Sequence, residues 1–274
     1  MAARAATVLR VLACRAPRDP SLAAWGRRLP ALVHERLRQV QGLCCRLDLE
    51  GTPRGRPGEW LLAGRVAVVP ERPSPAQTPR VLWQWWLVEA GAPAPVLERR
   101  LRFPPEALFA SVERVAELTA QALGHAAPRP PACYPATGSF FALRDWLRAV
   151  DLDDGHTELE EEDRRRALEW LLLAVEADPG FGPARDALLI SALRAHAQGL
   201  RREARRAVRL GSLLAPLDAR LPYVLAELLA LDARLEDAAR AYRRCVSVDP
   251  EHHEARRKLE RLQRRVGGGA RDWP

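Results

Sequence analysis

A spacing that recurs three times in the second half of the chain constrains the fold more than any other feature. Each copy has an alanine, a medium-sized residue four positions on, a small residue three further on, and a proline five beyond that. Residues three and four apart share one face of a helix, and proline ends a helix, so each copy predicts a helix with one closely packed face. The copies are Ala167, Leu171, Ala174, Pro179; Ala204, Val208, Gly211, Pro216; and Ala238, Tyr242, Cys245, Pro250.

The three prolines are 37 and then 34 residues apart, and this period resembles that of the tetratricopeptide (TPR) repeat. The resemblance covers about Ser139 to Val266 and implies pairs of antiparallel helices stacked into a solenoid. The expected pairs are 140–150 with 159–177, a middle pair that ends near Pro216, and 219–231 with 235–248. The segment 251–266 is expected to be a capping helix. Solenoids of this kind bind partners rather than catalyse reactions.

The resemblance also implies where a partner would bind. The first helices of the repeats would line a concave face that holds a peptide or a partner surface. On this face we expect contacts from Arg185, Leu189, Arg194, Arg220, Tyr223 and Glu227.

Short apolar runs separated by Gly- and Pro-rich turns fill the first half of the chain. They predict about five strands and two helices, and therefore a small α/β domain. The expected strands are 7–14, 43–49, 60–69, 80–89 and 97–103, and the expected helices are 21–40 and 105–123.

The order of these elements resembles the TolB-like amino-terminal domain that precedes TPR arrays in bacterial regulators. The likeness lies in the strand Trp60-Leu61-Leu62-Ala63-Gly64-Arg65-Val66, the strands 81–92 and 97–102, and the helix 108–123. It covers about residues 6–125. The chain departs from the family's pattern in its Trp-rich strands and in a long proline-rich loop at 70–79. We also expect neither a cyclase domain nor a helix-turn-helix ahead of this region. The resemblance therefore implies the arrangement and not a regulatory output.

Taken together, these patterns predict an α+β chain. It would comprise a TolB-like α/β domain at 1–125, a proline-rich linker at 126–138, and a TPR domain of about three helix pairs plus a capping helix at 139–266. A flexible tail would follow at 267–274.

The chain carries 43 basic and 35 acidic residues, a net charge of +8, and all its basic residues except Lys258 are arginines. Together with many Ala, Leu and Pro residues, this indicates the coding bias of a GC-rich, bacterial genome. Arginine content alone is therefore no evidence for phosphate contacts.

Two basic stretches still form helical stripes. They are either solvated faces or surfaces for an acidic partner or nucleic acid. No aromatic residues are interleaved with them, which argues against single-strand binding, and no nucleic-acid-binding motif is present. A nucleic-acid-associated or transcription-related accessory protein is the alternative function. The stripes contain Arg201, Arg202, Arg205, Arg206, Arg209, Arg257, Arg261 and Arg264.

Three tryptophans fall in the expected strand 80–89. Because side chains alternate along a strand, Trp83 and Trp85 share one face and Trp86 lies on the other. Either both faces are covered, or the strand presents an aromatic interface for a ligand, a partner or a second copy in a homodimer.

Nothing in the sequence indicates catalysis. The five cysteines are odd in number and show no CxxC spacing, which predicts neither a zinc site nor a disulfide framework. Motifs for nucleotide binding, serine hydrolases and zinc proteases are absent. We therefore expect no catalytic residue, no metal and no cofactor.

No apolar run approaches the 18 residues of a membrane span, and a reducing, cytoplasmic location is expected. The alternative is an exported envelope protein, because Val11-Leu12-Ala13-Cys14 loosely resembles a lipoprotein cleavage box. The expected function is that of a non-catalytic, regulatory scaffold that binds a partner protein or peptide through the TPR domain.

Overall fold

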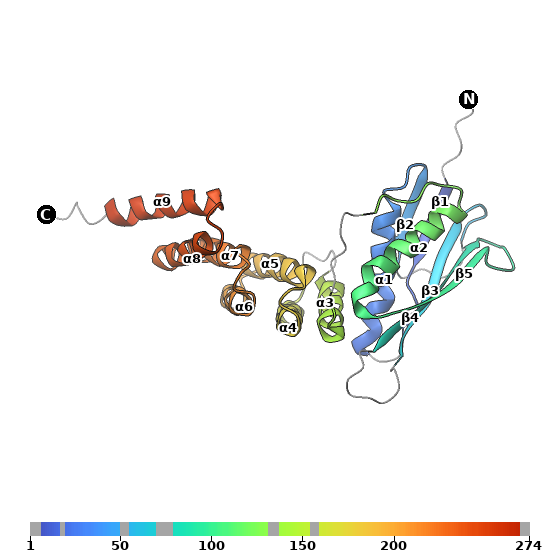
Figure 1. Ribbon diagram of the computed structural model, residues 1–274, viewed down its shortest axis with the longest axis horizontal. Coiled ribbons are helices and arrows are strands. Elements are labelled where there is room, and N and C mark those ends of the chain that lie inside the picture. Colours follow the sequence, from blue (N-terminus) through green and yellow to red (C-terminus); the bar gives the residue numbers. More distant parts are fainter. Residues whose placement is uncertain are drawn as a thin grey trace, which may run out of the picture. The chain divides into compact units, whose positions relative to one another are not determined.

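A computed structural model describes residues 7–16, 20–49, 55–69, 79–130, 137–153 and 159–268. The chain divides into two compact units, Met1–Asp151 and Leu152–Pro274. A five-stranded sheet lies in the first unit, and helices make up the described part of the second (Figure 1). The chain is therefore α+β, as predicted. The narrower domain bounds, including a linker at 126–138, stay a prediction.

The sheet of the first unit has the strand order β2-β1-β3-β4-β5. Strand β1 pairs in parallel with β2 and with β3, whereas β3, β4 and β5 pair antiparallel. The two edges of the sheet are therefore β2 and β5. The strands are β1 (Thr7–Leu12), β2 (Leu43–Asp48), β3 (Trp60–Val69), β4 (Arg80–Glu89) and β5 (Leu97–Phe103).

Two helices, α1 (Pro20–Leu37) and α2 (Leu108–Ala122), cover one face of this sheet (Figure 1). A short 3-10 turn, Pro105–Ala107, precedes α2. Buried residues recur every three or four positions along both helices, which is the pattern of one apolar face packed on a sheet. They are Trp25, Leu29, Val33, Leu37, Leu108, Val112 and Val115.

The covered face of the sheet contains two of the three neighbouring tryptophans. Trp83 and Trp85 are only 2% and 1% exposed, so they are core residues and cannot form the aromatic interface considered from the sequence. The reason is the period of the strand, which points both rings at the side that carries the helices. Trp86 lies on the opposite face and is half-buried.

One glycine makes room for this tryptophan-rich packing. Gly64 of β3 lies opposite Trp85 in the ladder with β4. A Cβ atom at Gly64 would lie 2.9 Å from Cys14 Sγ and 2.7 Å from the backbone oxygen of Gln84. A side chain there would collide with backbone as well as core atoms.

Helix α3 (Phe140–Asp153) belongs to the first unit as far as Asp151. Its Phe140 ring stacks on Trp25 of α1, with the ring centroids 6.0 Å apart. Asp151 accepts a 2.9 Å hydrogen bond from the Arg27 Nε of α1. The role of α3 as the first helix of a repeat stays a prediction.

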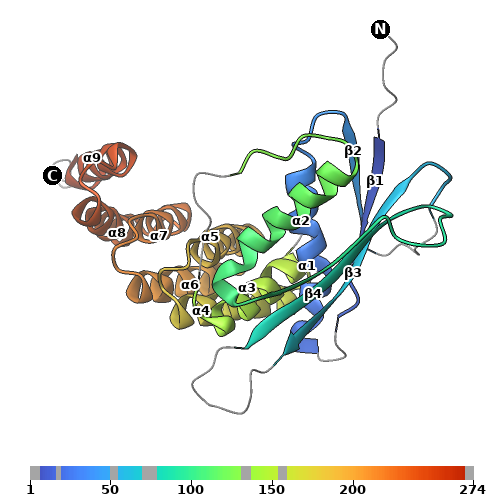
Figure 2. The same ribbon diagram turned by 45° about the vertical axis from the view of Figure 1, so that its right-hand side comes forward.

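The second unit is a succession of helices, each packed against the next one along the chain (Figure 2). Helix α8 begins and ends at the predicted residues, and α7 begins one residue later than predicted. The helices are α4 (Glu161–Ala177), α5 (Gly182–Ala197), α6 (Arg201–Leu214), α7 (Arg220–Leu231), α8 (Leu235–Val248) and α9 (His253–Gly268).

All nine non-proline residues of the recurring spacing are buried, on α4, α6 and α8. Gly211 shows why one of these positions is small. A Cβ atom there would lie 2.8 Å from Cδ2 of Leu188 on α5 and 3.2 Å from Cδ2 of Leu221 on α7. The spacing therefore marks the face of each helix that its neighbours approach most closely.

Candidate functional site

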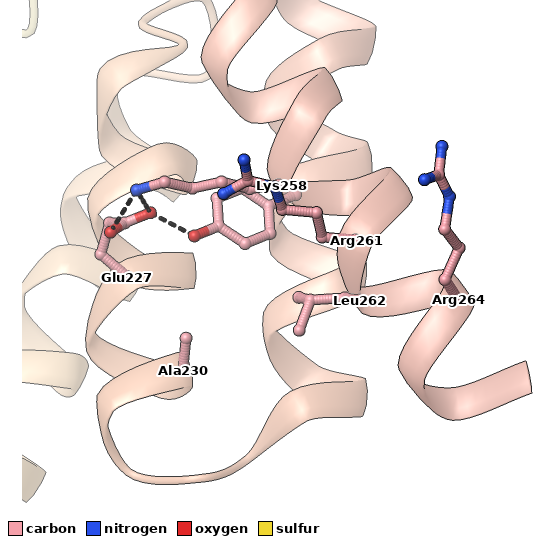
Figure 3. Close-up of a pocket in the computed structure, with 7 residues that line it drawn as sticks. Glu227, Ala230, Lys258, Arg261, Leu262 and Arg264 are labelled. Carbon is pink, nitrogen blue, oxygen red and sulfur yellow. Dashed lines mark hydrogen bonds and ion pairs between the residues drawn. The ribbon is translucent and has the colours of Figure 1, made fainter. Parts of the chain in front are cut away.

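A pocket of about 490 Å³ lies in the second unit between α7, α8 and α9, and we call it the α9 pocket (Figure 3). This volume is in the range of pockets that hold a small ligand or a large side chain. Helix α7 contributes Glu227 and Ala230, α8 contributes Tyr242, and α9 contributes Lys258, Arg261, Leu262 and Arg264.

An ion pair forms the inner wall of the α9 pocket. Lys258 Nζ donates hydrogen bonds to Glu227 Oε1 at 2.8 Å and to Oε2 at 2.7 Å. It also donates to the Tyr223 hydroxyl at 3.1 Å. The Tyr242 hydroxyl donates to the same Glu227 carboxylate. Glu227 is therefore compensated in charge and bonded from two helices.

These contacts fix the protonation of the wall. Burial alone would lower the pKa of Lys258, but its hydrogen bonds to Glu227 and Tyr223 outweigh burial and raise that pKa. Burial and the neighbouring Glu227 raise the pKa of Tyr242. At neutral pH the lysine is charged and the phenol is protonated. Neither group is activated as a nucleophile or a base.

The Tyr223 ring is used within the unit. It stacks on the His252 ring, with centroids 4.7 Å apart and an interplanar angle of 27°. Lys258 Nζ lies 5.3 Å from the centroid of the same ring. The Tyr223 ring therefore packs against the start of α9 and stabilises its position.

The α9 side of the pocket carries two arginines, Arg261 and Arg264 (Figure 3). Both are exposed, and neither makes a hydrogen bond or an ion pair with any residue in the part of the chain that the structure describes. Arg257 lies one turn earlier on the same helical stripe. The mouth of the pocket is therefore positively charged.

Of the six predicted partner contacts, Glu227 lines the α9 pocket and Tyr223 adjoins it. Arg185 and Arg220 instead meet at Asp218, with distances to Asp218 Oδ2 of 3.4 Å and 2.7 Å. Burial would raise the pKa of Asp218, but the bonds from Arg220 outweigh it and lower that pKa. These two arginines therefore join neighbouring helix pairs.

The remaining two predicted contacts lie on α5. Arg194 bonds the backbone oxygen of Asp153 at 3.2 Å. Leu189 is only 8% exposed and packs in the core, so its prediction as a partner contact is corrected. The exposed apolar residues of α5 are Ile190 and Leu193, at 51% and 43%. Leu188, Leu189 and Ile190 are consecutive and equally apolar, so the sequence alone does not mark which of them faces outward.

The predicted arginine stripe on α6 is partly neutralised. Arg201 and Arg205 pair with Asp232. Arg202, Arg206 and Arg209 are exposed, and they make no hydrogen bond or ion pair with the described residues.

The α6 stripe and the α9 stripe do not merge. Arg209 lines a groove of about 250 Å³ with Arg240 and Arg244 of α8. Neither this groove nor the one lined by Arg206 includes a residue of α9. The two basic stretches therefore serve different surfaces.

Sequence reasoning missed the floor of the α9 pocket, which Ala230, Tyr242 and Leu262 form. One signal was available, because Lys258 is a lone lysine among 43 basic residues. The spacing of residues along the chain does not predict that three helices line one cavity.

Within the described ranges, no group of three or more His, Cys, Asp or Glu side chains could hold a metal ion. The described helices include none with the length and apolar character to span a membrane. No protein-family model matches the chain, and no curated protein does.

Proposed function

We propose that this chain is a non-catalytic scaffold that binds a partner protein or peptide through its second unit. We further propose that this unit is a TPR array and that a TolB-like domain precedes it. The pairs α5–α6 and α7–α8, the near-constant period and the burial of the nine non-proline repeat residues support the TPR proposal.

One observation carries the binding proposal. Leu193, Glu227 and Arg261 lie 34 residues apart on α5, α7 and α9. The same interval joins buried residues of these helices, namely Ala192 with Ala226, Ala195 with Leu229, and Leu228 with Leu262, so the three positions are equivalent. Glu227 and Arg261 both line the α9 pocket, and Leu193 is 43% exposed. The same face of successive helices thus changes from apolar to cationic, with Ile190 extending its apolar end. Exposed apolar residues grouped in this way are typical of a binding surface.

Affinity capture from the native lysate tests this proposal, using the whole chain with and without nuclease at two salt concentrations. The informative variant is Leu193→Glu, and its control is Leu213→Glu on α6, where the native leucine is 61% exposed. We expect a discrete protein partner that survives nuclease, is lost with Leu193→Glu and is kept with Leu213→Glu. A partner kept by both variants would contradict the proposal.

The alternative is nucleic-acid binding, which Arg202, Arg206 and Arg209 favour, because they are exposed and pair with no residue that the structure describes. Binding through phosphate contacts falls steeply with salt. In this case nuclease would abolish capture. Changing the three arginines to glutamine would flatten the salt dependence, whereas Leu193→Glu would have no effect.

A further inference from the structure

The floor of the α9 pocket is apolar. Ala230 and the buried residues Tyr242 and Leu262 form it, at 2% and 9% exposure for the last two. The cavity volume of about 490 Å³ accommodates a leucine- or phenylalanine-sized side chain. Filling it would remove apolar surface from water, which is the main source of affinity in such a site.

The wall beside this floor does not repel anions. Glu227 accepts two hydrogen bonds from Lys258 and one from Tyr242, so its charge is already balanced. A carboxylate that enters the pocket therefore meets no uncompensated negative group there.

The mouth of the pocket attracts anions. Arg261 and Arg264 are three residues apart on α9 and both line the cavity. Neither guanidinium forms an ion pair with a described acidic residue. A guanidinium binds a carboxylate through two parallel hydrogen bonds, so two arginines at one mouth, neither paired with a described residue, favour a segment with more than one carboxylate.

We propose that the α9 pocket binds an acidic linear segment of the partner protein, with one large apolar side chain on the floor and flanking carboxylates on Arg261 and Arg264. This inference rests on the proposed function and names the chemistry of the partner. The cationic mouth of the pocket complements an acidic segment in charge, and the apolar floor accommodates the apolar side chain.

Nucleic acid fits the pocket less well. Single strands bind where bases stack on open aromatic rings. The Tyr242 ring is 2% exposed, and the Tyr223 ring stacks on His252. The aromatic groups at the pocket are thus already packed.

Fluorescence anisotropy with three labelled peptides tests the inference on the whole chain. The acidic probe is fluorescein–Ser-Glu-Glu-Leu-Glu-Glu-Ser-Gly. A second probe replaces the leucine by alanine, and a third replaces every glutamate by glutamine. We expect the acidic leucine probe to bind, and each of the other two to bind about tenfold more weakly or not at all.

Two double variants locate the binding. Arg261→Gln with Arg264→Gln is expected to weaken the acidic leucine probe by about tenfold or more. The matched control is Arg202→Gln with Arg206→Gln on α6, which removes the same charge and should change affinity less than about twofold. Unchanged thermal melting checks that each variant is folded. Ala230→Leu, which narrows the cavity without changing charge, should also weaken binding.

Three results would overturn the inference. They are no binding of the acidic leucine probe, an equal loss in both double variants, and equal affinity for the leucine and alanine probes. Failure here is separable from failure of the scaffold proposal. Capture of a lysate partner that depends on Leu193 but not on Arg261 and Arg264 would support the scaffold proposal and contradict the proposed pocket. Binding of the acidic leucine probe without any captured protein partner would support the pocket and contradict the scaffold proposal.

Discussion

Lys258 on α9 donates hydrogen bonds to both carboxylate oxygens of Glu227 on α7, at 2.8 and 2.7 Å. Residues 31 positions apart are thus joined across one interface, with Tyr242 of α8 donating to the same carboxylate. An ammonium group offers three donors around one compact charge, which suits two carboxylate oxygens and the Tyr223 hydroxyl. These hydrogen bonds hold α9 against α7 and α8.

Replacement of this lysine should loosen the second unit. Because each side chain of the pair is 29% exposed, we expect Lys258→Met to lower the free energy of unfolding by about 1–2 kcal/mol, less than for a fully buried pair. Urea denaturation measures the change. The control Arg240→Met breaks an exposed pair with Asp237 and should cost at most about 0.5 kcal/mol. Equal losses in the two variants would contradict the argument.

The same cluster predicts a loss of stability at alkaline pH. The pKa values of Lys258 and Tyr242 are raised in the folded chain, so the folded state keeps these protons when the unfolded state releases them. Their stabilisation is complete below the unfolded-state pKa values, near 10, and is lost as the pH rises through and above them.

We therefore expect the unfolding free energy of the native chain to fall above about pH 10. The decline should be shallower in Tyr242→Phe, which has lost one of the two groups. Denaturant titrations at a series of alkaline pH values give both slopes. Parallel slopes would show that Tyr242 titrates alike in both states.

Gly211→Ala should destabilise the second unit although alanine is the better helix former. The added methyl would lie 2.8 Å from Cδ2 of Leu188 and 3.2 Å from Cδ2 of Leu221, so these buried side chains, or the helices that carry them, must shift. Overpacking of this kind costs about 1–3 kcal/mol, against a gain of about 1 kcal/mol in helix propensity. The control is Gly182→Ala at the start of α5, where the nearest atom is 3.9 Å away. Thermal melting should rank Gly211→Ala below both the native chain and the control.

Cysteine reactivity should follow burial. Burial raises the pKa of the Cys14 thiol to about 12 and that of Cys245 to about 11, whereas Cys44 is exposed on β2. Because the thiolate is the reactive form, iodoacetamide at neutral pH should modify Cys44 and spare the other two. Mass spectrometry of each site checks this, in a Cys133→Ser background since Cys133 lies outside the described residues. Modification of Cys14 in the folded chain would contradict its position in the core.

The sequence predicted some elements closely and others poorly, for identifiable reasons. Strands β3, β4 and β5 begin and end at the predicted residues because turn-forming residues flank each of these segments. The sequence did not decide whether Trp83 and Trp85 are buried, because both faces of β4 carry apolar side chains. Only the position of α1 and α2 determines which face is covered.

The α9 pocket was harder to predict than the fold. Of the predicted partner contacts, Glu227 lines the pocket, whereas Leu189 is buried within a continuous apolar run. The floor of the α9 pocket was missed altogether, because Ala230, Tyr242 and Leu262 come from three helices and each looks like an ordinary packing residue. Pair distances across helices are tertiary information that no periodicity contains.

The strand order has a consequence for self-association. Strand β4 lies between β3 and β5, so both of its hydrogen-bonding edges are occupied. A second chain that extends the sheet on this side must pair with β5, where Arg99, Arg100 and Arg102 are exposed. Two such edges would repel each other, and charged edge strands are a common safeguard against unwanted sheet growth. The arginine-rich composition thereby protects this border of the sheet from aggregation.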